Sequence, residues 1–380
     1  MSAAESYILG IESSCDETAC ALVTREGRIR VSAVASQVDL HARFGGVVPE
    51  IAARMHIQAC LPLVQEVLDE TGATWTQIES IAVTQGPGLI GCLLVGLETA
   101  KTLAWLRRKP LIAVNHLAGH LYGVNLVPER GAHTLIEHGE TFHVLPLAPE
   151  SGADPQATPE PLRVDRPPYP HVGLIVSGGH TSLVWAESPD RFETIAQTRD
   201  DAAGEAYDKV ARVMGLGYPG GPIVDRLAAE GNPDGFAVTT PMMRRDKPDF
   251  SFSGLKTAVG REAERLKAQH GGTIPEPRLK DLCAAFQRAA VEALMGKSLD
   301  AAHARGARDL VITGGVACNC GLRARAAELT VRRHGVRVWF PHPSLCTDNA
   351  AMIAGLAWNL KPLDAQEALC LNAQATMSLS

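Results

Sequence analysis

The stretch Tyr7-Ile-Leu-Gly-Ile-Glu-Ser-Ser-Cys-Asp-Glu-Thr-Ala-Cys-Ala-Leu-Val23 consists of two apolar runs on either side of a polar turn. Short apolar runs around a polar turn are typical of a β-hairpin, so we predict strands at 7–12 and 19–23. The pattern returns about 165 residues later, where apolar runs at 171–176 and 182–185 flank Ser177-Gly-Gly-His-Thr181. Two such hairpins in one chain indicate an internal duplication.

Helical patterns alternate with short apolar strands in the rest of the chain. A helix is predicted from about Pro49 to about Glu70, because proline is favoured in the first turn and apolar residues follow at helical spacing. The remaining predicted strands lie at 80–84, 111–114 and 309–313, and the remaining helices at about 90–107, after Cys320 and at about 349–359. This alternation indicates an α/β fold with substantial parallel pairing.

The range 127–170 is rich in proline and short of aromatic residues, which argues against a helix or an inner strand there. We interpret it as a surface insertion or linker between two halves. The predicted organisation is a first domain at 1–126, completed by about 349–380 at the C-terminal end, the insertion or linker at 127–170, and a second domain at 171–348.

The composition indicates a globular protein of the cytoplasm. Among 380 residues 46% are hydrophobic, but the longest apolar stretch, Leu89 to Leu97, is too short to span a membrane, and no signal peptide pattern opens the sequence. The nine scattered cysteines suggest no disulfide framework. A net charge of −6 disfavours global attraction to nucleic acid, so any such contact must be local. The best basic cluster, which is equally well explained as the solvated face of a helix, contains Arg323, Arg325, Arg332, Arg333 and Arg337.

His116 and His120 stand four residues apart in Asn115-His-Leu-Ala-Gly-His120, and Asp348 lies far downstream. On a helix this spacing places both imidazoles on one face, where they can share a cation with a carboxylate. Zinc peptidases use the same interval with a glutamate directly after the first histidine, but Leu117 occupies that position here. Two histidines on one helix face can also be ordinary polar or core residues.

Three glycine-containing turns resemble known ligand-binding patterns to different degrees. Gly86-Pro-Gly-Leu-Ile-Gly91 matches the dinucleotide fingerprint, but no acidic residue follows at the required distance, so we interpret its glycines as allowing close backbone packing. The turn Ser177 to Thr181 leaves backbone amides open to phosphate oxygens. Its counterpart, Ser13 to Thr18, adds hydroxyls and the carboxylates of Asp16 and Glu17. Asn319, after the Thr313-Gly-Gly turn, offers an amide, and Asp208 and Asp225 offer acceptors for ribose hydroxyls or act as helix caps.

The motifs resemble, in order, those of the tRNA threonylcarbamoyladenosine synthesis family TsaD. They cover nearly the whole chain except 127–170, and they are Gly10-Ile-Glu-Ser-Ser-Cys-Asp-Glu-Thr18, Phe44-Gly-Gly-Val-Val-Pro-Glu50, Gly86-Pro-Gly-Leu-Ile-Gly91, His116-Leu-Ala-Gly-His120, Val176-Ser-Gly-Gly-His-Thr181, Phe250-Ser-Phe-Ser-Gly-Leu-Lys256 and Cys346-Thr-Asp-Asn349. The resemblance implies a two-domain actin-like, sugar-kinase-like fold with a ligand cleft between the domains. It also implies transfer of threonylcarbamoyl from threonylcarbamoyl-AMP to the exocyclic amine of the adenosine 3′ of the anticodon, in tRNAs that read ANN codons.

The resemblance further implies ligands and partners. One divalent metal, usually iron(II) in this family and with zinc as the alternative, would be held by His116, His120 and Asp348. The residues that match the family's substrate site are Ile175, Val176, Ser177, Gly178, Gly179, Asp208, Gly221, Asp225 and Asn319. Asp16 and Glu17 are candidate catalytic residues for proton removal or for ordering the site. The partners would be tRNA, a TsaB-like paralogue in a heterodimer, and a TsaE-like ATPase, with no membrane involved.

Three other functions stay open from the sequence. They are a metallopeptidase of the glycoprotein endopeptidase type, a small-molecule kinase or ATPase of the same fold class, and a noncatalytic scaffold. Two features depart from the family pattern: the length of 127–170, and the cysteines Cys318 and Cys320 on either side of Asn319, whose oxidation would disturb the substrate pocket.

Overall fold

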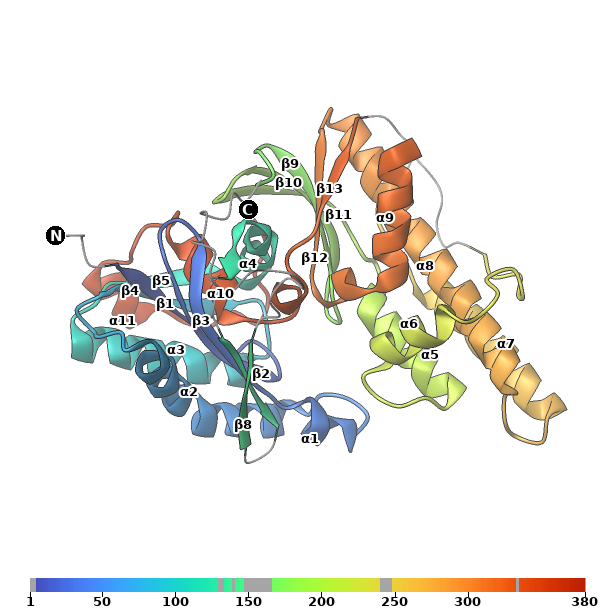
Figure 1. The fold of residues 1–380 in the computed structure, drawn as a ribbon, viewed down its shortest axis with the longest axis horizontal. Coiled ribbons are helices and arrows are strands. Elements are labelled where there is room, and N and C mark those ends of the chain that lie inside the picture. Colours follow the sequence, from blue (N-terminus) through green and yellow to red (C-terminus); the bar gives the residue numbers. More distant parts are fainter. Residues whose placement is uncertain are drawn as a thin grey trace, which may run out of the picture. The chain divides into compact units, whose positions relative to one another are not determined.

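The computed structural model describes residues 5–128, 133–138, 141–146, 166–239, 248–332 and 335–379. The chain divides into two compact units, one formed by Met1–Arg166 with Thr347–Leu379 and the other by Pro167–Cys346. Each unit is built around its own mixed sheet (Figure 1). None of the helices in the described ranges combines the length and apolar character needed to cross a bilayer.

The sheet of the first unit has the strand order β5-β4-β1-β2-β3-β7-β8, with β6 paired to β3. The strands β1, β2 and β3 are antiparallel, whereas β4 and β5 run parallel to β1. The bounds are β1 Tyr7–Glu12, β2 Glu17–Val23, β3 Arg28–Ser36, β4 Ile78–Gly86, β5 Leu111–Asn115, β6 Val127–Pro128, β7 His133–His138 and β8 Thr141–Pro146. The helices of this unit are α1 Val38–Ala42, α2 Pro49–Thr71, α3 Ile90–Arg107, α4 His116–Tyr122, α10 Ala350–Ala357 and α11 Ala365–Cys370.

Helices cover both faces of this sheet, α2 and α3 on one side and α4 and α10 on the other (Figure 1). The helix α10 consists almost entirely of small and apolar residues and lies directly on β1. A Cβ atom on Gly10 would lie 2.4 Å from the carbonyl oxygen of Ala350, so only glycine permits this approach. The packing matters for function because Asp348 stands just before α10.

The sheet of the second unit has the order β11-β10-β9-β12-β13, again with three antiparallel strands followed by two parallel ones. The strands are β9 His171–Val176, β10 Thr181–Ser188, β11 Arg191–Gln197, β12 Asp309–Thr313 and β13 Arg337–Trp339. The helices are α5 Ala203–Met214, α6 Gly220–Ala228, α7 Ser253–Gln269, α8 Glu276–Ala304 and α9 Cys320–Arg332. The five strands β3-β2-β1-β4-β5 of the first sheet have the same order and directions as β11-β10-β9-β12-β13, which confirms the internal duplication and the actin-like α/β fold class.

The predicted hairpins, strands and helices named above are all present, with ends that differ by a few residues. Several elements were not predicted; they are the strands β3, β11 and β13 and the helices α1, α5, α6, α7, α8 and α11. The range 127–170 differs from expectation, because its described part includes β6, β7 and β8, and β7 lies between β3 and β8 as an inner strand. The prediction that no inner strand forms there is wrong for His133–His138, a segment without proline. Four prolines of the range 127–170 lie outside the described residues; they are Pro149, Pro155, Pro159 and Pro161.

Close backbone packing at the turn after β4 is confirmed. A Cβ on Gly86 would lie 2.0 Å from the carbonyl oxygen of Gln374, and one on Gly88 would lie 2.6 Å from that of Ser14. The glycines therefore serve packing within the first unit, in agreement with the rejection of the dinucleotide fingerprint.

Candidate metal centre and substrate-binding loops

The helix α4 positions both histidines. Asn115, the last residue of β5, caps α4 by accepting hydrogen bonds from the backbone N–H groups of Leu117 at 2.9 Å and Ala118 at 3.2 Å. The four-residue interval then places the rings of His116 and His120 on one face, with centroids 4.7 Å apart in an edge-to-face arrangement. Both imidazoles are buried, so they are not ordinary surface polar groups.

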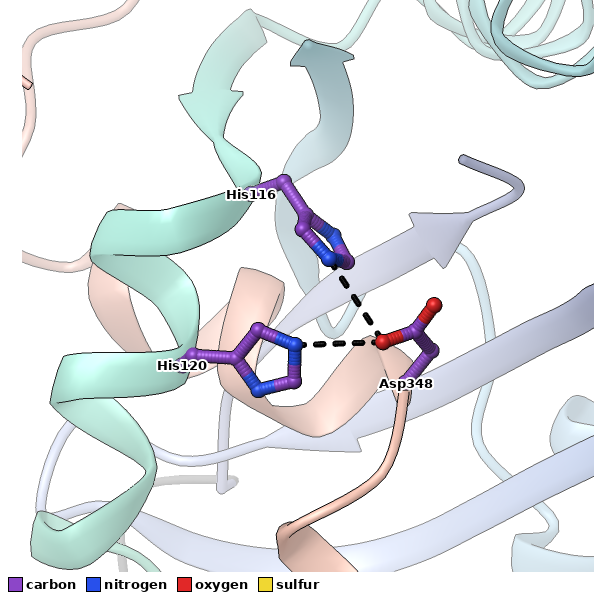
Figure 2. Close-up of side chains that lie close together, drawn as sticks. All are labelled: His116, His120 and Asp348. Atoms are coloured by element: carbon purple, nitrogen blue, oxygen red, sulfur yellow. Dashed lines mark hydrogen bonds and ion pairs between the residues drawn. The ribbon is translucent and has the colours of Figure 1, made fainter. Parts of the chain in front are cut away.

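Asp348 reaches the same place from the segment that leads into α10 (Figure 2). Its Oδ1 atom lies 3.1 Å from Nε2 of His120 and 3.5 Å from Nε2 of His116. Asn349 caps α10 by accepting a hydrogen bond from the N–H of Met352 at 2.9 Å, which fixes the start of that helix. The helices approach closely at Gly119, where a Cβ would lie 3.0 Å from Cδ1 of Ile353.

The three side chains fit a metal ion. One ligand atom from each of His116, His120 and Asp348 lies within 4.8 Å of the others, so a cation could sit among them. Two imidazole nitrogens and one carboxylate oxygen suit both ferrous iron and zinc and leave coordination positions for a substrate. The sequence prediction that these residues come together is confirmed.

Glu12 lies beside His116, on the side of the imidazole ring opposite Asp348. The sequence alone indicated no role for this residue. Its Oε2 atom is 3.0 Å from Nδ1 of His116 and accepts a hydrogen bond from the Thr84 hydroxyl at 2.5 Å. The backbone N–H of Ser14 donates to Oε1 at 2.5 Å. A carboxylate in this position holds the proton on Nδ1 and leaves the lone pair of Nε2 for a metal, as second-layer carboxylates do in many metal sites.

The charges of this cluster stabilise one another. Burial alone would raise the pKa of Glu12, but the neighbouring His116 lowers it below the usual value. Burial would also lower the pKa of His116, whereas Glu12 and Asp348 raise it well above the ordinary histidine value. Against the opposing effect of burial, the two histidines lower the pKa of Asp348. Glu12 and Asp348 are therefore carboxylates, as a cation site requires.

Asp16 and Glu17 lie in the β1–β2 turn, which a buried histidine holds in place. The Thr18 hydroxyl lies 2.7 Å from Nδ1 of His56, and Nε2 of His56 lies 2.9 Å from the carbonyl oxygen of Cys15. Glu17 is the first residue of β2, and burial together with the charge of Asp16 raises its pKa well above the usual value. A carboxyl group of this kind is a stronger base than an ordinary glutamate.

The glycine turn of the second unit joins β9 to β10. It is closed by a hydrogen bond from the N–H of Ser177 to the carbonyl oxygen of His180 at 2.8 Å. Cβ atoms on Gly178 or Gly179 would meet nothing within 4 Å, so the backbone of this turn is open to a ligand. Ile175 and Val176 are buried in β9, where they pair with β10 and, at Ile175, also with β12.

Asp208, Asp225 and Asn319 each hold the start of a helix. Asp208, in α5, accepts a hydrogen bond from the N–H of Gly220 at 2.7 Å at the start of α6. Burial raises its pKa, although the backbone N–H groups of Gly220 and Gly221 oppose the rise. Asp225, in α6, accepts from the N–H of Cys320 at 2.8 Å at the start of α9, and Asn319 accepts from that of Leu322 at 2.8 Å. The helix-cap interpretation of these residues is thus supported.

A cavity of about 300 Å³ lies between α6, α8 and α9, and one of its lining residues, Gln287, forms hydrogen bonds with Asp225 and Asn319. Six of its eleven lining residues are small or apolar, four are charged, and the remaining one is Gln287. The lining residues that bear on recognition are Ala228, Gln287, Arg288, Glu292, Gly321 and Ala324. A planar apolar group with a polar edge suits such walls.

The basic cluster is largely engaged within the protein. Arg323 donates to the carbonyl oxygen of Ala317 at 2.7 Å and lies over the Phe340 ring, Arg325 pairs with Glu292, and Arg337 pairs with Asp309. The side chains of Arg332 and Arg333 lie outside the described residues. The internal contacts of Arg323, Arg325 and Arg337 disfavour a nucleic acid patch. The interpretation as a single helix face holds for Arg323 and Arg325 on α9 but not for Arg337, which lies in β13.

The two cysteines beside Asn319 have different neighbours. The Cys318 thiol donates to the carbonyl oxygen of Pro343 at 3.5 Å, and the backbone N–H of Cys320 donates to the Asp225 carboxylate at 2.8 Å. The hydrogen bond from Cys346 and the charge of Arg323 lower the pKa of Cys318 to about 7 against the opposing effect of burial.

Comparisons with known proteins agree with the site. The family model described as "TsaD: tRNA N6-adenosine threonylcarbamoyltransferase" matches residues 28–137 and 156–355. A tRNA N6-adenosine threonylcarbamoyltransferase of Symbiobacterium thermophilum is 45% identical over 376 residues, which are 99% of this chain and 97% of that protein. One of Sorangium cellulosum is 46% identical over 351 residues, 91% of this chain and 89% of that protein.

Among solved structures, the component A of (R)-2-hydroxyglutaryl-CoA dehydratase from Acidaminococcus fermentans aligns with a TM-score of 0.49 at 14% identity, covering 93% of this chain and 98% of that one. YeaZ from Pseudomonas aeruginosa aligns with a TM-score of 0.29 at 17% identity, covering 50% and 63%. These similarities are too distant to bear on function, whereas the sequence matches span nearly the whole chain. The chain therefore belongs to the family of tRNA N6-adenosine threonylcarbamoyltransferases.

Proposed function

We propose that this tRNA N6-adenosine threonylcarbamoyltransferase uses threonylcarbamoyl-AMP as donor and the adenosine 3′ of the anticodon, in tRNAs that read ANN codons, as acceptor. In this reaction the exocyclic amine attacks the carbamoyl carbon, the bond from that carbon to the phosphate oxygen breaks, AMP leaves, and the amine loses a proton. The observation that carries the proposal is the His116, His120 and Asp348 cluster with Glu12 behind it.

The metal at this cluster is proposed to be iron(II), with zinc as the second possibility for the same ligands. When bound, such an ion supplies Lewis-acid polarisation of the threonylcarbamoyl oxygens, which makes the carbonyl carbon more electrophilic towards a weak aryl amine. His116 and His120 would offer Nε2, and Asp348 would offer Oδ1. Glu12 keeps His116 in the tautomer that this role needs.

The second unit is proposed to bind the adenylate. The open backbone at Gly178 and Gly179 offers N–H groups to the phosphate. Ile175, Val176 and Ser177 lead into this turn and would hold it in place, since the Ser177 N–H closes it by donating to His180. Asp208 and the Gly221 backbone would take the ribose. Asp225 and Asn319 would hold the base at the mouth of the 300 Å³ cavity, whose apolar walls suit a purine.

The proton from the amine is proposed to pass to the Asp16 and Glu17 pair. Burial and the charge of Asp16 raise the pKa of Glu17, which makes its carboxylate form a better base. The test compares Asp16→Asn and Glu17→Gln with wild type in the transfer assay. Full activity in both variants would exclude the pair from proton transfer.

A TsaB-like paralogue is proposed to dock on the exposed apolar face of α2 and α3. Four large aliphatic side chains at helical spacing are exposed there, Ile57 by 67%, Leu61 by 57%, Ile90 by 48% and Leu94 by 42%. The two helices pack side by side, since a Cβ on Gly91 would lie 3.3 Å from that of Ala53. Several exposed large apolar side chains on two adjacent helices are typical of a protein interface. Leu61→Glu with Leu94→Glu should abolish co-purification with the paralogue, and an intact complex would exclude this face.

The remaining partner is a TsaE-like ATPase, and because the substrate is tRNA, we place the protein in the cytoplasm. Transfer is tested with purified protein, threonylcarbamoyl-AMP and an ANN-reading tRNA transcript, with and without the two partners. The expected product is N6-threonylcarbamoyladenosine with equimolar AMP. Peptide cleavage is disfavoured because Leu117 occupies the position of the peptidase glutamate and Glu12 is engaged with His116.

A further inference from the structure

Gln287 lies between Asp225 and Asn319 in the second unit. It stands in the middle of α8, and its side chain is buried, with 7% of the residue exposed. Its Nε2 atom donates to Oδ1 of Asp225 at 2.9 Å, and its Oε1 atom accepts from Nδ2 of Asn319 at 2.8 Å. One amide therefore connects a residue of α6 to the residue that precedes α9.

The backbone N–H of Leu322 determines which atom donates and which accepts in the hydrogen bonds that join Asn319, Gln287 and Asp225. The N–H of Leu322 at the start of α9 can only donate, so the Asn319 atom that it contacts must be the amide oxygen. The NH₂ group of Asn319 consequently faces Gln287, so the Gln287 atom that accepts its hydrogen bond must be Oε1. The Nε2 of Gln287 then faces Asp225, whose Oδ2 accepts from the N–H of Cys320.

We infer that Gln287 is a positioning residue for nucleotide binding, because it fixes the orientation of the Asp225 carboxylate and the Asn319 amide at the edge of the cavity that it also lines. This inference rests on the proposed roles of Asp225 and Asn319. The hydrogen bond to Gln287 uses one N–H of the Asn319 amide, so the other N–H keeps a fixed orientation towards a ligand. The Asp225 carboxylate is oriented in the same way by its hydrogen bond from Gln287. A buried network with matched donors and acceptors holds its members rigidly, which lowers the entropic cost of binding a ligand.

Gln287→Met removes both hydrogen bonds while conserving the length of the side chain. It leaves an amide N–H and a carboxylate oxygen without this partner in a buried place. Tyr207→Phe is the matched control, because the Tyr207 hydroxyl makes only a long hydrogen bond of 3.4 Å to the same Oε1 atom and contacts neither Asp225 nor Asn319 through it. Circular dichroism and the melting temperature report whether each variant keeps its fold.

The probe is AMP, measured by titration calorimetry, followed by KM and kcat for threonylcarbamoyl-AMP. Gln287→Met should weaken AMP binding about tenfold, equivalent to about 1.4 kcal/mol, and raise KM with little change in kcat, whereas Tyr207→Phe should change both constants less than about twofold. Unchanged AMP binding in a folded Gln287→Met protein overturns the inference. A rise in KM together with an equally large fall in kcat, both in proportion to a fall in the melting temperature, indicates a structural role only and also overturns the inference.

A second variant keeps the inference testable if Gln287→Met does not fold. Gln287→Glu retains the acceptor for Asn319 but places a carboxylate oxygen against Asp225, so AMP binding should again fall; binding equal to wild type contradicts the inference. In an Asn319→Ala, Asp225→Ala background, Gln287→Met should have no additional effect, and a full additional loss would show that it acts by another route. A wild-type protein that binds neither AMP nor threonylcarbamoyl-AMP would instead overturn the proposed function of this unit.

Discussion

Nδ1 of His116 lies 3.0 Å from Oε2 of Glu12, while Nε2 of the same ring lies 3.5 Å from Oδ1 of Asp348. The imidazole thus stands between two carboxylates that use its two different nitrogens. Only Nε2 is available to a metal, and Glu12 determines which tautomer presents it. The relationship explains why the last residue of β1 is a buried glutamate in an otherwise apolar strand.

The first prediction concerns Glu12→Gln. The amide keeps the shape of the carboxylate but no longer holds the Nδ1 proton by a charge-assisted hydrogen bond, so the affinity for Fe(II) or Zn(II) should fall roughly 10-fold to 100-fold. Competition with a chromogenic chelator measures the affinity. Glu26→Gln, on the surface of the same unit, is the control and should bind metal as wild type does. Equal affinities for Glu12→Gln and wild type would remove Glu12 from the metal site.

A second prediction uses two glycines with different surroundings. Gly10→Ala should destabilise the protein by about 1–3 kcal/mol or more, because the new methyl group meets the Ala350 backbone and pushes α10 away from β1. Gly260→Ala, inside α7, should be neutral or stabilising by up to about 1 kcal/mol, because its methyl group makes an ordinary contact with Val213. Urea unfolding of the two variants compares them directly. Equal stabilities would show that α10 does not lie on β1 as described.

The third prediction concerns the pH dependence of alkylation at Cys318. With a pKa of about 7, this thiol should be roughly one tenth thiolate at pH 6 and nine tenths at pH 8, and its reaction with iodoacetamide should rise accordingly. Cys320, whose pKa is raised by the neighbouring Asp225, should react more slowly at pH 7. Peptide mass spectrometry measures both rates in one sample.

The Cys346→Ala variant tests the cause of this reactivity. Removal of the thiol that forms a hydrogen bond to Cys318 should move the alkylation midpoint of Cys318 to higher pH. If the midpoint stays near pH 7, the hydrogen bond is not its cause.

The sequence was sufficient to predict those parts of the fold that depend on local patterns. The hairpins β1–β2 and β9–β10 follow from apolar runs around small polar turns, and α3 follows from its apolar content and length. The inner strand β7 was missed because the prolines of its neighbours outweighed the six residues that contain none. The short helix α11 was missed because its capping box, at Asp364 and Glu367, was not recognised.

The metal cluster was predictable because two of its members are helical neighbours and the third lies in a recognisable motif. Glu12 and Gln287 were not predictable from spacing, since each meets its partners only after distant elements have packed together. Glu12 is 104 residues from His116 in the sequence, and Gln287 is 62 residues from Asp225. A buried charged residue at the end of the apolar strand β1 was the available signal for Glu12; Gln287, in a long helix, offered none.

The central claim, that one cation is held by His116, His120 and Asp348 and is needed for transfer, is tested most directly with Asp348→Asn. Protein purified without oxygen is assayed for bound metal and for modification of an ANN-reading tRNA, with Asp190→Asn, an exposed turn residue, as control. The account predicts about one metal ion per wild-type and control chain, little in Asp348→Asn, and a loss of transfer of about 100-fold or more in that variant. Full metal content together with full tRNA modification in Asp348→Asn would contradict it.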